Sequence, residues 1–208
     1  MSGMARDRYL EPYRQSVSRH GSTFHATLWA NEAAQKKRFE VFAQMCALSG
    51  KRIMDAGCSR GDFVRYLVET GVEFAEYVGV DGVEQVIDFA SSQRLARCRF
   101  IAGDFLTDPA LLATGEPHVV CISGALNTMT DKQVAAALEA AWSAAGQTLL
   151  FNFLPDLAGP LASHQTGPAR RLDTLRLIRW ATGKTGHVGY RQDYFNHGHD
   201  ATIMMHKR

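Results

Sequence analysis

The sequence predicts an α/β fold, with a doubly wound sheet of seven strands that is mostly parallel and ends in an antiparallel hairpin. Residues 51–67 combine a short apolar strand, a turn of small residues and the start of an amphipathic helix. Strand and helix patterns then alternate, which is typical of a parallel sheet covered on both faces. The last two strand patterns have no helix between them, so we expect them to pair as an antiparallel hairpin.

Each element rests on a local pattern. Asn31 is a plausible N-cap for a helix over 33–48, whose apolar residues recur on one face. A loop with three prolines and two glycines follows the fifth strand, over 155–168. The expected strands are 53–54, 77–80, 98–102, 118–122, 148–153, 188–194 and 201–206, and the later expected helices are 63–68, 84–96, 131–144 and 170–180.

The length of 208 residues fits a single domain. Within it, we expect residues 1–50 to form an N-terminal helical extension, because segment 13–29 is richer in polar and aromatic residues than a linker needs. Such an extension often folds over a ligand pocket as a lid. Residues 51–208 are expected to form the ligand-binding part of the same structural unit.

Charge and cysteine usage narrow the class of protein. The formal net charge of +2 argues against a dominant nucleic-acid or membrane footprint, although a local basic patch is compatible with it. No apolar run approaches the ~20 residues of a membrane span, and no secretory signal is visible. The four cysteines have no CxxC spacing, which favours reduced thiols in the cytoplasm and no zinc site. At His197, His199 and Asp200 an exposed hairpin turn is favoured over a metal site.

The turn at residues 55–61 separates two kinds of nucleotide site. Its order is Asp55-x-Gly57-x-Ser59-x-Gly61, with the acid ahead of the first glycine. A dinucleotide site has G-x-G-x-x-G, and an acid here would repel pyrophosphate. The acid would attract an ammonium group, such as that of the methionine part of S-adenosylmethionine (SAM). The turn resembles motif I of class I SAM-dependent methyltransferases, D/E-x-G-x-G-x-G, whose fold is Rossmann-like. Ser59 replaces the middle glycine, which is tolerable if its φ stays below zero.

An acid at the end of the second strand fits the same kind of ligand. Asp81 lies 26 residues beyond the first acid, where a carboxylate can accept hydrogen bonds from ribose hydroxyls. The alternative is that Asp81 only caps the helix that follows. With ribose bound at Asp81, Gly82 and Val83 would lie along the adenosine.

The third and fourth strand ends complete the expected site. In the family that the turn resembles, an acid after the third strand commonly takes the adenine amino group. Gly103-Asp104-Phe105 stands there, so Phe105 would cover the base; the alternative is a solvated loop acid. The segment after the fourth strand lacks Asn/Asp-Pro-Pro-Tyr, which argues against methylation of adenine N6 or glutamine amides.

Short motifs over nearly the whole chain resemble a small, largely uncharacterised subgroup of these methyltransferases. Its members show Y-x-x-x-V/I-x-x-H-G, W-N/S and Q-x-x-R-F near the N-terminus, then S-G-x-x-N, F-N-F-L and D-Y. The matching residues are Tyr13, Val17, His20, Gly21, Trp29, Asn31, Gln35, Arg38, Phe39, Ser123, Gly124, Asn127, 151–154, Asp193 and Tyr194. The resemblance implies the class I fold, SAM as cofactor and S-adenosylhomocysteine (SAH) as product. It leaves the methyl acceptor open.

Candidate site residues follow from these positions. The catalytic candidates are His25 from the lid, Asn127 after the fourth strand and Tyr194 from the hairpin, although a lone histidine is more often structural. Trp29 could stack on the ligand or anchor the lid. Arg38 could bind the methionine carboxylate of SAM or an acidic acceptor, or lie on a helix surface. The expected cofactor-binding set is Trp29, Arg38, Asp55, Gly57, Cys58, Ser59, Gly61, Asp81, Gly82, Val83, Gly103, Asp104, Phe105, Ser123 and Gly124.

The favoured function is therefore transfer of a methyl group from SAM to an oxygen or nitrogen of a small-molecule acceptor. The alternatives are an RNA or protein methyltransferase, a nicotinamide-dependent oxidoreductase, and a non-catalytic SAM-binding module. The expected partner is the small-molecule acceptor, with no membrane, with nucleic acid disfavoured, and with the oligomeric state left open. The expected location is the cytoplasm.

Overall fold

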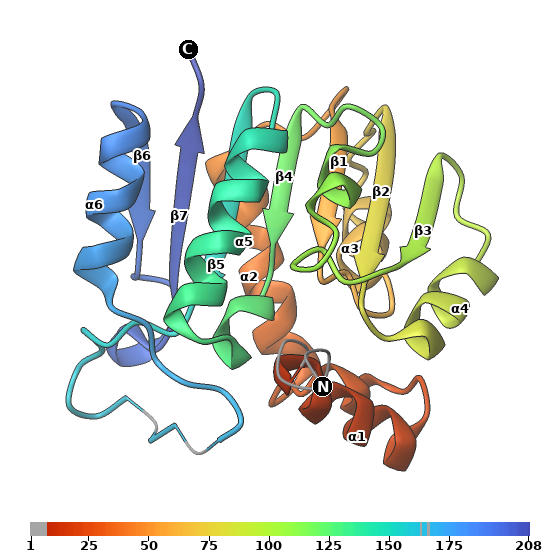
Figure 1. The fold of residues 1–208 in the computed structure, drawn as a ribbon, viewed down its shortest axis with the longest axis horizontal. Helices are drawn as coiled ribbons and strands as arrows, with labels where there is room; N and C mark the ends of the chain where they lie inside the picture. The colour runs from red at the N-terminus through yellow and green to blue at the C-terminus, as the bar shows by residue number, and fades with distance from the viewer. Residues whose placement is uncertain (1–7, 163, 166) are drawn as a thin grey trace.

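A seven-stranded sheet forms the centre of the molecule, with the strand order β3-β2-β1-β4-β5-β7-β6 (Figure 1). The computed structural model describes residues 8–162, 164–165 and 167–208, so the first seven residues of the expected extension lie outside it. Neighbouring strands from β3 to β5 pair in parallel, and β7 runs antiparallel to both of its neighbours. The strands are Arg52–Ala56 (β1), Glu76–Asp81 (β2), Cys98–Ala102 (β3), Val119–Ile122 (β4), Thr148–Phe153 (β5), His187–Arg191 (β6) and Ala201–His206 (β7). The predicted α/β fold is thus confirmed.

The last strand is inserted into the sheet and does not lie at its edge. β6 and β7 pair as the predicted antiparallel hairpin, with His187 opposite His206. On its other side β7 pairs with β5, with Thr148 opposite the same His206. The start of β7 therefore lies beside the carboxyl end of β5, close to where the parallel strands end.

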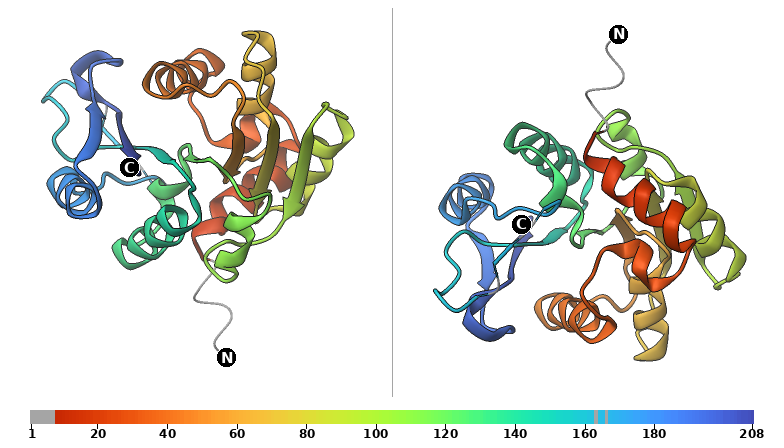
Figure 2. Two further views of the ribbon diagram at one scale, coloured as in Figure 1. Left: turned by 90° about the horizontal axis from the view of Figure 1, so that it is seen from above. Right: turned by 90° about the horizontal axis from the view of Figure 1, so that it is seen from below.

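Helices cover both faces of the sheet. The helices α2 and α3 pack on one face through a cluster that includes Phe42 and Phe63, and α5 and α6 pack on the other through Leu138 and Leu177 (Figure 2). The α-helices are Glu11–His20 (α1), Glu32–Met45 (α2), Asp62–Glu69 (α3), Glu84–Ser92 (α4), Asp131–Ala144 (α5) and Thr174–Lys184 (α6). The short 3-10 helices are Arg8–Leu10 (η1), Phe24–Thr27 (η2), Pro109–Ala113 (η3), Ala125–Thr128 (η4) and Asn196–Gly198 (η5).

Capping residues set where the helices begin. Asn31 accepts a hydrogen bond from the Ala34 amide, so it is the N-cap of α2, as predicted. Asp173 accepts one from Arg176 and starts α6 at Thr174, four residues later than the predicted helix over 170–180. Helix α4 stops at Ser92, short of the predicted residue 96, and the chain beyond it turns through Arg94 with a φ of 51°.

The N-terminal segment divides into a covering part and a core part. Helix α1 crosses below the carboxyl ends of the parallel strands, together with η1 and η2 (Figures 1 and 2). Helix α2 instead packs against the sheet, where Phe39 and Phe42 are buried. Residues 8–30 are therefore the part of the extension that lies over the strand ends, and they are called the covering segment below.

Candidate functional site

A cavity of about 310 Å³ lies between the covering segment and the carboxyl ends of the parallel strands. This is the edge at which ligands bind in open α/β sheets, and the volume lies at the lower end of the range of small-molecule sites. Residues from α1, the turn after β1 and the ends of β2 and β4 contribute to its wall. The predicted site residues that line it are Trp29, Arg38, Gly57, Ser59, Asp81, Gly82, Val83, Phe105, Ser123, Gly124 and Asn127.

The other predicted site residues do not line the cavity. Cys58 is buried with its sulfur against Gly79, Gly61 packs on Phe100, and Gly103 packs on Leu111. Asp55, Asp104, His25 and Tyr194 also lie outside the lining and are described below. These residues shape the walls or the neighbourhood of the cavity.

The turn after β1 brings backbone against the cavity. Gly57 has a φ of 81°, and a Cβ added to it would lie 2.7 Å from the Cβ of Ala125. Only glycine avoids both the strained backbone and the clash. Ser59 has a φ of 46°, so the expectation that its φ stays below zero is wrong. Its amide donates to Asp81 Oδ2 at 2.9 Å, and this bond holds the residue in the left-handed region.

Replacing Ser59 by glycine is expected to raise the free energy of unfolding by up to about 1 kcal/mol. Relief of the left-handed strain, about 1–2 kcal/mol, is partly offset by the greater freedom of glycine in the unfolded chain. The amide that bonds Asp81 is kept, so affinity for SAH should stay within about threefold. Urea denaturation and calorimetric titration measure the two effects. A marked loss of stability would show that the serine side chain contributes to the turn.

Asp81 is held by two backbone amides and lines the cavity. Its Oδ1 accepts from the Val83 amide at 2.9 Å, and its Oδ2 accepts from the Ser59 amide. Burial raises the pKa of this carboxyl to about 6, although both backbone bonds act in the opposite direction. Each carboxylate oxygen keeps acceptor capacity beyond one amide bond, so the carboxylate can also receive hydroxyl groups from the cavity.

Two further acids are bonded to tyrosines. The Tyr9 hydroxyl donates to Asp104 Oδ1, which also accepts from the Leu106 amide at 2.8 Å. The other oxygen of Asp104 is buried and has no hydrogen-bond partner among the described residues. The Tyr77 hydroxyl donates to Asp55 Oδ2 behind the turn, and burial raises the pKa of Asp55 to about 7.

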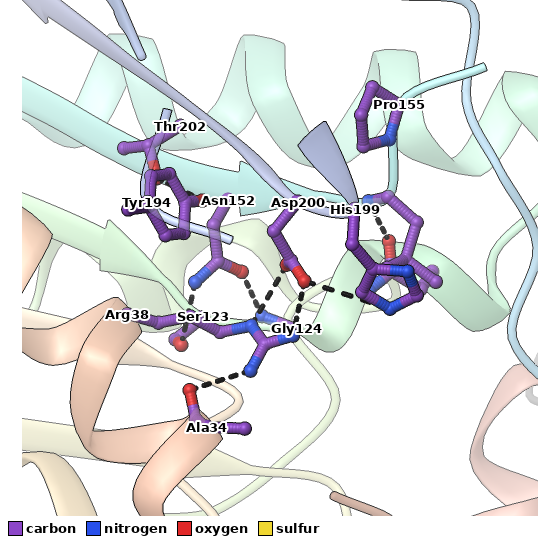
Figure 3. A network of polar contacts seen from close by, with 12 residues as sticks. Ala34, Arg38, Ser123, Gly124, Asn152, Pro155, Tyr194, His199, Asp200 and Thr202 are labelled. Carbon is purple, nitrogen blue, oxygen red and sulfur yellow. Dashed lines mark hydrogen bonds and ion pairs between the residues drawn. The ribbon is translucent and has the colours of Figure 1, made fainter. Parts of the chain in front are cut away.

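Two asparagines fix the loop after β4, and Figure 3 shows the contacts of Asn152 with Ser123 and Gly124. Asn152 is fully buried; its Oδ1 accepts from the Gly124 amide at 2.7 Å, and its amide nitrogen donates to Ser123 Oγ. Asn127 Oδ1 accepts from the Leu154 amide at 3.0 Å. Because that bond orients the side chain and Asn127 lines the cavity, its NH₂ group is the part left to meet a ligand.

A buried ion pair stands at the far side of the cavity (Figure 3). Arg38 Nε donates to Asp200 Oδ1 at 2.8 Å, a second bond joins Nη2 to Oδ2, and Nη1 donates to the Ala34 carbonyl. The guanidinium lies between the rings of Trp29 and Phe195, 4.2 and 4.6 Å from their centroids. Arg38 is only 4% exposed, so the helix-surface alternative is wrong. Three of its five N–H donors are already used within the protein.

The histidine that lines the cavity is His199, and the predicted catalytic candidate His25 does not line it. His25 is exposed, and its ring lies 5.6 Å from that of His20. His199 lines the cavity, with its Nε2 3.9 Å from Asp200 Oδ2. Burial lowers the pKa of His199, with Arg171 and Arg38 acting in the same direction and Asp200 against them. Tyr194 is buried and shares a hydrogen bond with Thr202.

The sequence analysis gave no role to several residues that line the cavity. Tyr9, Tyr13 and Val17 recur every four residues, and they reach the cavity from η1 and α1. That helical spacing of aromatic and apolar residues was the available signal. His199 had no such signal, because its place beside Arg38 depends on the inserted strand β7. Within the part of the chain that the structure describes, no three His, Cys, Asp or Glu side chains gather as a metal site would require.

Residues 53–145 match a protein family described as "Methyltransferase domain". Among solved structures, the chain is similar to magnesium protoporphyrin IX methyltransferase from Synechocystis with bound SAM, at 15% identity and a TM-score of 0.67, over 96% of this chain and 97% of that one. It is also similar to phosphoethanolamine N-methyltransferase 1 of Haemonchus contortus, at 12% identity and a TM-score of 0.72, over 99% of this chain and 50% of that one. A third similar structure is the DhpI–SAM–HEP complex, at 15% identity and a TM-score of 0.65, over 94% of each chain. The comparison with curated proteins gives no match.

These structural likenesses, at 12–15% identity, show the fold alone. The seven-stranded sheet is the class I methyltransferase fold, as predicted. The matched segment contains the turn after β1 and the ends of β2, β3 and β4, which surround one half of the cavity. Among the described residues, no helix combines the length and the apolar character needed to cross a bilayer.

Proposed function

We propose that this chain, which has a matched methyltransferase domain over residues 53–145, is a SAM-dependent enzyme that transfers the methyl group of SAM to an oxygen or nitrogen of a small-molecule acceptor. The observation that carries the proposal is the enclosed cavity over the strand ends, lined by Asp81 and by the backbone of Gly57 and Ser59. The covering segment forms the opposite wall of that cavity. An enclosed site of this size suits a small acceptor better than a macromolecular strand. Four cysteines without disulfides support a cytoplasmic location.

The residues present fit SAM as the cofactor. A Cβ at Gly57 would collide with Ala125, so the turn leaves room only for backbone next to the cavity. Asp81 offers carboxylate oxygens for ribose hydroxyls. Asp104 precedes the lining residue Phe105, and its buried Oδ2, which has no hydrogen-bond partner among the described residues, is an acceptor suited to an amino group such as that of adenine. Phe105 supplies an apolar wall beside it.

When bound, SAM supplies an activated methyl group on a sulfonium, so the protein's task is to position the acceptor and to match charge. We assign acceptor positioning to the loop after β4. Asn152 holds the backbone of Gly124 and the hydroxyl of Ser123, and Asn127 presents its NH₂ group to the cavity. Trp29 packs directly on Gly124, where a Cβ would overlap its ring, and so closes the site against water on that side.

The covering segment is proposed to act as a lid. Leu10 packs on Gly82, where a Cβ would lie 2.5 Å from Leu10 Cδ1. Tyr9 bonds Asp104, and Ser22 donates to the Gln85 carbonyl at 3.0 Å. These contacts tie residues 8–30 to the ends of β2 and β3 and to the first turn of α4, over the adenosine side of the proposed site. Exchange of SAM for SAH then requires the segment to move.

Calorimetric titration of the purified protein with SAM, SAH and NAD tests the proposal, followed by an acceptor screen that monitors SAH formation. We expect binding of SAM and SAH, no response to NAD, and turnover with small hydroxyl or amine acceptors. Binding of NAD alone would reject the function. Methylation of RNA or protein, with no methylation of small molecules, would instead support the alternative of an RNA or protein methyltransferase.

Removing the carboxylate of Asp81 is expected to weaken SAH binding by about 1–3 kcal/mol, the cost of losing a buried hydrogen-bond partner. The Asp81→Asn variant removes the negative charge but keeps the shape of the side chain and one acceptor oxygen, so it distinguishes the effect of charge from that of shape. The pKa of Asp81 is raised to about 6 in the protein, so protonation weakens the acceptor as the pH falls through 6. Wild-type affinity should therefore decrease below that pH, and the affinity of Asp81→Asn should not. Unchanged affinity in both Asp81→Asn and Asp81→Ala would reject the ribose assignment.

A further inference from the structure

A second, more open hollow of about 970 Å³ lies along the solvent side of α1. Arg8, Arg14, Arg19 and His20 line it, and Glu11 is the single carboxylate among its described lining residues. Glu11 accepts a hydrogen bond from Gln15 at 2.9 Å, which orients its carboxylate along the helix. We call this hollow the cationic groove.

The chain around the cationic groove has a net positive charge. Residues 8–25 contain three arginines and one glutamate, a net charge of +2, which equals the formal net charge of the chain. All other charges therefore balance across the rest of the sequence. A cluster of side chains with a net positive charge produces a directed electrostatic field, and a hollowed surface focuses it.

The cationic groove adjoins the cavity. Leu28 and Pro168 belong to the lining of both hollows. A molecule that spans the two would pass between the end of the covering segment and the loop after β5. That loop also contributes Gln165, Gly167 and Ala169 to the cavity, on the side away from Asp81 and Asp104.

We propose that the cationic groove binds the anionic group of the methyl acceptor, a phosphate or a carboxylate, while the nucleophilic end of the acceptor reaches into the cavity past Leu28 and Pro168. The inference rests on the proposed function and narrows its acceptor to acidic small molecules. Arginines recognise both groups through paired, charge-assisted hydrogen bonds.

Titration of the SAH-loaded protein with pyrophosphate and with citrate tests anion binding directly. We expect both anions to bind, with affinity that falls as sodium chloride is raised. The tighter of the two identifies phosphate or carboxylate as the preferred group. Absence of binding by either anion, in protein that binds SAH, would overturn the inference and leave the proposed function standing. Failure to bind SAH at all would instead reject the proposed function.

Charge reversal locates the bound anion. In the Arg8→Glu/Arg19→Glu variant we expect at least a tenfold loss of affinity for the preferred anion, with SAH affinity unchanged. Arg179→Glu is the matched control, because Arg179 is exposed on α6 and lines neither hollow. An equal loss in the control would show a non-specific charge effect and would overturn the inference.

Turnover of paired acceptor compounds, one neutral and one anionic, tests whether the cationic groove contributes to catalysis. Phenol and hydroxybenzoate, aniline and aminobenzoate, and glycerol and glycerol phosphate present the same nucleophiles without and with an anion. Any turnover should favour the anionic member of a pair, and the double reversal should raise its KM with little change in kcat. Preference for the neutral members would overturn the inference. So would tight binding of a short single-stranded RNA at the same arginines, since it would assign the groove to nucleic acid.

Discussion

Replacing Asp200 by alanine should lower the free energy of unfolding by about 3–5 kcal/mol, the cost of leaving one member of a buried ion pair without its partner. Asp200 is 0% exposed and Arg38 is 4% exposed, so solvent cannot replace the missing carboxylate. The guanidinium would remain between the rings of Trp29 and Phe195 with two donors unpaired. Urea denaturation measures the loss.

Two comparison variants make this prediction specific. Removing both charges, as in Arg38→Met/Asp200→Leu, should recover much of the loss, because no uncompensated charge then remains buried. Glu69→Ala removes one member of the exposed pair between Lys36 and Glu69, which are 3.2 Å apart, and should cost at most about 1 kcal/mol. If Asp200→Ala cost no more than Glu69→Ala, the buried pair would not be the stabilising contact described above.

Replacing Gly57 by alanine should weaken SAH binding at least about 100-fold. The new Cβ would lie 2.7 Å from the Cβ of Ala125, so the turn after β1 or the start of η4 would have to shift. Both segments line the cavity, and a displacement of about 1 Å in a binding site is enough to lose its positioning. Calorimetric titration with SAH measures the effect.

Gly50→Ala is the matched control for this variant. Gly50 has a φ of 71°, close to the 81° of Gly57, but a Cβ there would meet nothing within 4 Å. The two variants therefore share the cost of backbone strain and differ in the clash. Gly50→Ala should lose some stability and keep its SAH affinity. Equal loss of affinity in both variants would assign the effect to strain and would contradict the role given to the Gly57 turn.

The fold could be predicted from the sequence because its strands and helices are local patterns in a regular order. The acid and the glycines of the turn after β1, and the acid at the end of β2, could be read from spacing alone. Asp81 and Gly57 do lie at the cavity. Helix ends were less certain, because a cap such as Asp173 decides them by one hydrogen bond.

The parts that could not be predicted depend on contacts between distant segments. Arg38 meets Asp200 across 162 residues, so a helix pattern around Arg38 gives no indication of its burial. Ser59 lies at a positive φ because Asp81, 22 residues away, holds its amide. His199 reaches the cavity only because β7 enters the sheet between β5 and β6.

Strand β7, which is inserted between β5 and β6, is also the last strand in the sequence. β6 pairs in the sheet only with β7, and it is synthesised before its neighbour exists. Arg38 is made far earlier still, and its carboxylate partner is the residue just before β7. Until residues 201–206 join the sheet, one edge of β5 has no strand partner, and the Arg38 guanidinium lacks the carboxylate of Asp200 that pairs with it in the interior. Residues 200–206 thus supply both the carboxylate that pairs with Arg38 in α2 and the strand that joins β6 to the sheet.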